Sequence, residues 1–189
     1  MNRRRFLIGT LGAGAVTLGA PWLASAGAAT DDELAFANFG LSSEFLLKDF
    51  YAKALEAKLA TGVVRGDLRR GRSASAQHAK ALTGLLTGAG ETPAAEEDFA
   101  FVWPEKTFAT LSSATTTGLV ILRGVLGAYQ SAAATVSEPS YRVLYTSLAA
   151  SIAQQIGALA AASGKAGSES FPAALDLETA SAALENYLG

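Results

Sequence analysis

The chain has 189 residues, which is enough for one domain with a buried core. It contains no cysteine, which excludes a disulfide framework and a thiolate metal site. Half of the residues are hydrophobic, 17% are charged and alanine is abundant, a composition that favours an all-α fold. The formal net charge is −2, and without the three arginines of residues 1–26 it is 12 − 17 = −5. So acidic a chain argues against nucleic acid or an anionic membrane surface as a partner.

Residues 1–26 have the pattern of an export signal. Arg3 and Arg4 stand before Arg-Phe-Leu, a weakly apolar run follows, and residues 24–26 form a small-residue cleavage motif. The pattern resembles a twin-arginine (Tat) signal peptide, and an ordinary secretory signal or a membrane anchor is the alternative. We therefore predict Tat export to the periplasm or the medium, with the mature domain at residues 27–189.

The first predicted helix begins after Thr30 and runs to about Gly62. Thr30 and Glu33 fit a capping box, with acidic residues in the first turn, where the helix dipole favours them. Apolar residues at helical spacing follow, with Glu44 near the middle. A second helix is predicted over about residues 67–87, and it carries His78, the only histidine of the chain.

Residues 91–106 contain two prolines and no helical period. We expect an ordered crossover that lays Phe99, Phe101 and Trp103 over the helices. Beyond it, helices are predicted at about 107–136 and 140–163, then a flexible hinge at 163–170, and a short last helix that Asp176 caps and that ends at Leu188.

The third and fourth predicted helices are unusually apolar. Arg123 is the only charged residue between Lys106 and Glu138. A helix that is apolar all round is normally buried all round, and Gln154 and Gln155 argue against a bilayer span. We expect no stable membrane span in the mature chain, and instead close packing of these helices in the bundle or in a homodimer.

The lengths of the loops between the predicted helices indicate how the helices are arranged. Short loops join helices one and two and helices three and four, whereas a long crossover joins helices two and three. This is the connectivity of ferritin-like bundles. The sequence therefore predicts an all-α, ferritin-like four-helix bundle with a short C-terminal helix.

Four segments resemble a known family. They are NFGLSSEFLLKDFYAKALE, HAKALTGLL, TTTGLVILRGVLGAY and FPAALDLETASAALENYL. In order and spacing they resemble the secreted ferritin-like family that includes the desiccation-related proteins, and the resemblance covers essentially the whole mature chain. It implies an exported bundle with a role in envelope or desiccation-type stress.

The resemblance also implies where a metal centre would lie. Family members that keep a di-iron centre use a helix-one Glu, a Glu-x-x-His on helix two, a helix-three Glu and a Glu-x-x-His on helix four, because residues three apart share a helical face. Glu44 and His78 match two of these positions, whereas Ser75 and Thr115 stand where glutamates are expected. Helix four offers only Gln154 and Gln155. The centre is therefore incomplete, and ferroxidase activity is not expected.

Glu44 and His78 permit two interpretations. As a remnant site they could hold one weakly bound divalent ion; as a structural pair, Glu44 would accept a hydrogen bond from His78. A buried carboxylate needs a partner, and we favour the structural pair. Arg123 is the alternative partner, because a Glu44–Arg123 ion pair in the core could replace the missing metal charge. Otherwise Arg123 extends outward to solvent.

Residues 65–72, RGDLRRGR, place four arginines near the turn between helices one and two. They could bind an anion or a partner, but a solvated face balanced by Asp67 is the favoured interpretation.

These patterns predict an exported bundle without a cofactor that acts by binding or packing. The alternative is a metal-binding or redox protein that uses Glu44 and His78. A third hypothesis is a bundle that binds a small apolar molecule in the vacated metal cavity.

Overall fold

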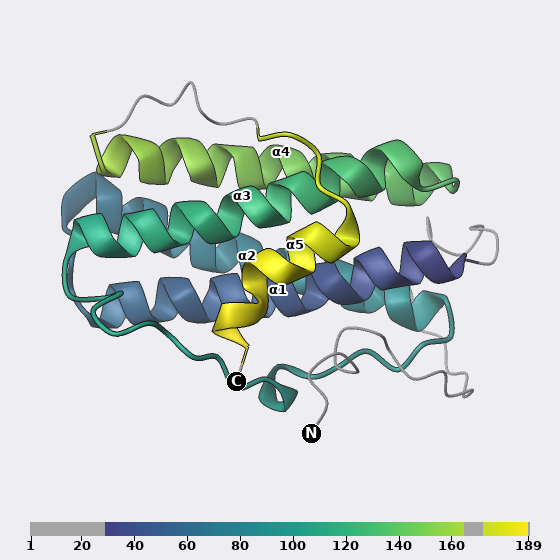
Figure 1. The fold of residues 1–189 in the computed structure, drawn as a ribbon, viewed down its shortest axis with the longest axis horizontal. Helices are drawn as coiled ribbons and strands as arrows, with labels where there is room; N and C mark the ends of the chain where they lie inside the picture. Colours follow the sequence, from purple (N-terminus) through teal and green to yellow (C-terminus); the bar gives the residue numbers. More distant parts are fainter. Residues whose placement is uncertain (1–28, 165–171, 189) are drawn as a thin grey trace.

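The computed structural model describes residues 29–164 and 172–188, and this part of the chain folds as an antiparallel helical bundle (Figure 1). The export signal predicted at residues 1–26 and most of the hinge lie outside the described residues. The all-α prediction is confirmed. The elements are α1 (Asp31–Glu56), α2 (Gly62–Gly88), α3 (Leu111–Thr135), α4 (Pro139–Ala162) and α5 (Leu177–Leu184), with 3₁₀ turns at Glu96–Asp98 and Glu185–Tyr187.

The capping box predicted at the start of α1 is present. The backbone N–H of Thr30 donates to the Glu33 carboxylate at 2.8 Å, and the N–H of Glu33 donates to Oγ1 of Thr30 at 3.3 Å. The helix ends at Glu56, several residues earlier than predicted, because Lys58 adopts a left-handed conformation with φ of 55°.

Helix α2 begins at Gly62, ahead of the predicted start at Asp67. Val64 packs against the core and Leu68 is buried. Burial of these apolar side chains outweighs the low helix propensity of Gly66.

Close contacts between helices fix their directions. Glu44 faces His78 and Tyr51 faces Gly71, so α2 runs antiparallel to α1. A Cβ atom at Gly118 would lie 2.6 Å from Cζ of Phe50, so the missing side chain lets that ring reach the α3 backbone. Since Gly40 likewise meets Tyr129, α3 is also antiparallel to α1 and therefore parallel to α2, as the long crossover requires.

The crossover between α2 and α3 runs along one side of the bundle (Figure 1). Its aromatic side chains cover the core as predicted. The ring of Phe99 lies 5.6 Å from that of Phe45, the ring of Trp103 lies 5.8 Å from that of Phe50, and Phe101 forms an isolated β-bridge with Leu188. Trp103 Nε1 also donates to Asp49 at 2.7 Å, which satisfies the polar end of the indole.

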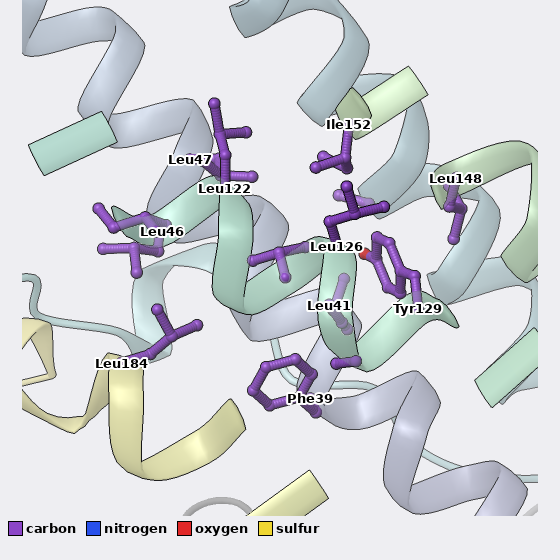
Figure 2. Close-up of a cluster of buried hydrophobic side chains, with 14 of the residues drawn as sticks. Phe39, Leu41, Leu46, Leu47, Leu122, Leu126, Tyr129, Leu148, Ile152 and Leu184 are labelled. Carbon is purple, nitrogen blue, oxygen red and sulfur yellow. The ribbon is translucent and has the colours of Figure 1, made fainter. Parts of the chain in front are cut away.

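Helices α3 and α4 are each long and apolar enough to cross a membrane by length and composition alone. In the bundle, α3 buries Leu122 and Leu126 in the core, and Figure 2 shows Leu126 beside Leu148 and Ile152 of α4. Buried core helices pass the same test, so the absence of a membrane span stays a prediction, as does a homodimer through these helices.

Candidate functional site

The side chain of Glu44 is completely buried at the centre of the bundle. Its Oε1 accepts a hydrogen bond from the hydroxyl of Tyr129 at 2.9 Å and lies 3.0 Å from Nδ1 of His78. Its Oε2 has no hydrogen-bond partner. The three residues come from α1, α3 and α2, and we call them the Glu44 cluster.

A glycine makes the contact with Tyr129 possible. Gly40 lies one turn before Glu44, and a Cβ atom there would stand 3.0 Å from Cε1 and 3.2 Å from the hydroxyl oxygen of Tyr129. Without that Cβ, the ring packs closely against α1 and its hydroxyl reaches the carboxylate. Figure 2 shows Tyr129 in the core beside Leu126 and Leu148.

The electrostatic environment keeps the nearby phenols neutral. Burial, and next the charge of Glu44, raise the pKa of Tyr129 well above its ordinary value. The same two causes raise the pKa of Tyr51. Both hydroxyls therefore stay protonated at neutral pH and act as hydrogen-bond donors. Tyr129 is thus a donor to Glu44 and a poor candidate for a phenolate metal ligand.

The alternative ion pair between Glu44 and Arg123 is not formed. Oε1 of Glu44 is bonded by Tyr129 and His78, and Oε2 is bonded by no group. Arg123 is only half-buried and shares the face of α3 that exposes Val120. The donor that α3 supplies to the carboxylate is the neutral hydroxyl of Tyr129, which sequence reasoning missed because it searched for a charge.

The residues that stand in place of the family glutamates lie in different surroundings. Ser75, one turn before His78, is fully buried and its hydroxyl has no partner. Thr115 is buried too, but its hydroxyl donates to the carbonyl of Ser112 at 3.1 Å. Since Gly118 already faces Phe50, the antiparallel register carries Thr115 further from Glu44. Thr115 is therefore not the α3 residue opposite Glu44.

The two glutamines of α4 also differ in their surroundings. Gln154 is exposed, whereas Gln155 is buried and its Oε1 accepts a hydrogen bond from the Tyr51 hydroxyl at 2.8 Å. Sequence reasoning did not pair Tyr51 with Gln155, because the residues are 104 positions apart and neither belongs to a recognisable motif.

The Glu44 cluster does not fit a di-iron centre. Two iron ions need several anionic ligands, typically carboxylates from all four helices. This cluster offers one carboxylate, one imidazole and a neutral phenol, and no group of three or more His, Cys, Asp or Glu side chains able to hold a metal occurs among the described residues. With one carboxylate and one imidazole, the cluster could hold at most one ion, at the unbonded Oε2 of Glu44.

Comparison with known protein families places the chain. Residues 32–165 match the model of a family described as "Ferritin-like domain". No curated protein matches the chain. The family match covers well over half of the sequence and includes all four long helices together with the crossover. The protein therefore belongs to the ferritin-like domain family.

Proposed function

We propose that this protein is an exported, non-catalytic member of its family that acts by binding or packing in the cell envelope. In it, the Glu44 cluster takes the place of a di-iron centre as a structural element of the core. The observation that carries the proposal is the double use of Oε1 of Glu44, which accepts from Tyr129 and pairs with His78.

The chemistry of the cluster supports a structural role. The two contacts tie α1 to α2 and to α3 at one point, and hydrogen bonds to a buried carboxylate are stronger than those between neutral groups. Export is supported by Arg3, Arg4 and the cleavage motif at residues 24–26. A role in envelope or desiccation-type stress follows from the resemblance to the secreted ferritin-like proteins.

A second candidate is a metal-binding or redox protein with one divalent ion at Glu44 and His78. The specific observation in its favour is the unpartnered Oε2 of Glu44, since a buried carboxylate oxygen without a donor is costly. A cation at that oxygen would remove the cost.

Elemental analysis separates the two functions. The protein is purified from the exported fraction without chelator or affinity tag, and iron, manganese, zinc and copper are measured. We expect less than about a tenth of an equivalent of any of them, because one carboxylate and one imidazole are too few ligands to retain an ion, whereas a structural metal would survive purification. A near-stoichiometric metal that is lost in Glu44→Gln but retained in Glu56→Gln would overturn the proposal in favour of the second candidate. Glu56 is the matched control, because it is an exposed glutamate at the end of the same helix.

A further inference from the structure

Most of the basic side chains of α2 lie on one face of the helix. Arg65, Arg69 and Arg72 follow one another at intervals of four and three residues, and Lys80 lies about two turns further on. At 3.6 residues per turn, these positions fall within about a quarter of the helix circumference and extend over about 22 Å. Arg69, Arg72 and Lys80 are exposed, and Arg65 is half-buried. We call these four residues the basic stripe.

Asp67 does not balance the basic stripe. It is the only acidic residue of α2, and it forms an ion pair with Arg70, which lies off the stripe. Asp67 and Arg70 both line the pocket between α2 and α4. The four residues of the stripe form no ion pair with any residue of 29–164 or 172–188. The interpretation of residues 65–72 as a face balanced by Asp67 therefore holds for Arg70 alone.

The basic stripe is unfavourable in the isolated protein. Like charges one turn apart on a helix repel each other and destabilise it, and Arg69 has an arginine about one turn away on either side. Helix α2 carries five Lys and Arg residues and one Asp, a net charge of +4. The whole chain has a formal charge of −2, which leaves −6 for the remainder. A cationic face on an acidic protein attracts anionic groups locally, and bound carboxylates would relieve the repulsion.

The dimensions of the stripe favour a short acidic polypeptide segment. The stripe is only one helix face wide, and the remainder of the chain is acidic. A nucleic acid or a flat anionic membrane would also meet that acidic remainder and be repelled by it. A single acidic helix or strand, in contrast, has to contact only α2. Guanidinium groups bind carboxylates through two parallel hydrogen bonds, so Arg69 and Arg72 suit Asp and Glu side chains.

We propose that the basic stripe is the docking surface for an acidic segment of a partner protein. Arg69 and Arg72 pair with carboxylates of that segment, and Lys80 binds a further carboxylate about 12 Å along α2. Arg65 adds to the positive field. The inference rests on the binding role proposed above but not on the Glu44 cluster. Its failure would therefore leave the measured metal content and the structural role of Glu44 unchanged.

Calorimetric titration of the purified protein tests the inference. The probe is an alanine-based helical peptide of about 18 residues with a glutamate at every third or fourth position, and its control has glutamines at the same positions. We expect saturable binding of the glutamate peptide that weakens between about 20 mM and about 150 mM salt, because salt screens exposed charges. The glutamine peptide should not bind. No saturable binding of the glutamate peptide, or equal binding of both, would refute the docking surface.

A double variant, Arg69→Gln with Arg72→Gln, assigns the binding to the stripe. Affinity for the glutamate peptide should fall about tenfold, since each exposed ion pair contributes about two- to fivefold. The matched control is Lys58→Gln with Lys106→Gln, which removes the same charge from exposed positions outside α2. It should bind the peptide as the unchanged protein does. An equal loss in both double variants would show that net charge alone governs binding and would overturn the proposal.

Two further measurements separate the docking surface from other roles of the arginines. The double variant of the stripe should be at least as stable to urea as the unchanged protein, because it loses a like-charge repulsion. A lower midpoint would mean that the arginines stabilise the fold instead. A single-stranded oligodeoxythymidylate and phosphatidylglycerol vesicles should bind more weakly than the glutamate peptide. Tighter binding of either would replace the acidic partner protein by a nucleic acid or a membrane.

Discussion

Two buried glutamates on α1 are satisfied very differently. Glu33, 3% exposed, uses both oxygens. Oε2 accepts from the N–H of Thr30 at 2.8 Å, and Oε1 accepts from the N–H groups of Ser137 and Glu138 at 2.8 and 3.1 Å. Glu44, fully buried, places both of its contacts on one oxygen and leaves the other without any. The fold supplies hydrogen-bond partners to both carboxylate oxygens of Glu33 but to only one oxygen of Glu44.

The carboxylate of Glu33 joins two segments at one end of the bundle. It caps the start of α1 and holds the turn between α3 and α4. Burial alone would raise its pKa, but hydrogen bonds from the backbone of Thr30, Glu138 and Ser137 together lower the pKa below the ordinary value. Hydrogen bonding to the charged form therefore outweighs desolvation at this site.

The largest predicted effect is that of Glu33→Gln. At pH 7 we expect the free energy of unfolding to fall by about 2–3 kcal/mol, because the amide N–H₂ replaces an acceptor and faces a backbone N–H. Urea unfolding measures the loss, and Glu56→Gln serves as the exposed control.

The same variant has a predicted pH dependence. Because the folded-state pKa of Glu33 is lowered, its stabilisation is present above the unfolded value of 4.5 and is lost as the pH falls through the folded value. The difference between the two proteins should therefore shrink at pH 3. An equal difference at pH 7 and pH 3 would show that the charge of Glu33 is not what stabilises the turn.

The second prediction concerns Glu44 and its hydrogen-bond donor Tyr129, which packs against Gly40. Gly40→Ala would place a methyl group 3.0 Å from the Tyr129 ring and 3.1 Å from Leu82. We expect a loss of about 1–2 kcal/mol in the free energy of unfolding, since the ring has to move away from Glu44. In the control, Gly84→Ala on α2, the new methyl group meets no atom within 4 Å. It should gain about 0.5–1 kcal/mol through helix propensity. A similar gain in both variants would mean that Tyr129 is not held closely.

The two glutamates also show what could be predicted from the sequence. The capping box was readable because Thr30 and Glu33 are three residues apart and helix capping is local. The second oxygen of Glu33 bonds to Ser137, 104 positions away, and no local sequence pattern predicts that contact. Tyr129 was missed for the same reason: a tyrosine at the end of an apolar helical run is typical of a core residue. Helix order and the crossover were predictable, since periodicity and prolines are local signals, whereas the partners of Glu44 depend on the packing of three helices.

The smallest predicted effect is that of Glu44→Gln, although Glu44 is the more deeply buried of the two. An amide can still accept from Tyr129 through its oxygen, and its N–H₂ takes the place of Oε2, which has no donor to lose. Removing a buried charge also removes its desolvation cost. We therefore expect the free energy of unfolding at pH 7 to change by less than about 1 kcal/mol. Urea unfolding of Glu44→Gln beside Glu33→Gln makes the comparison. If Glu44→Gln lowered the free energy of unfolding as much as Glu33→Gln does, a cation would have to compensate the Glu44 charge in the folded protein. That result would support a metal ion at Oε2.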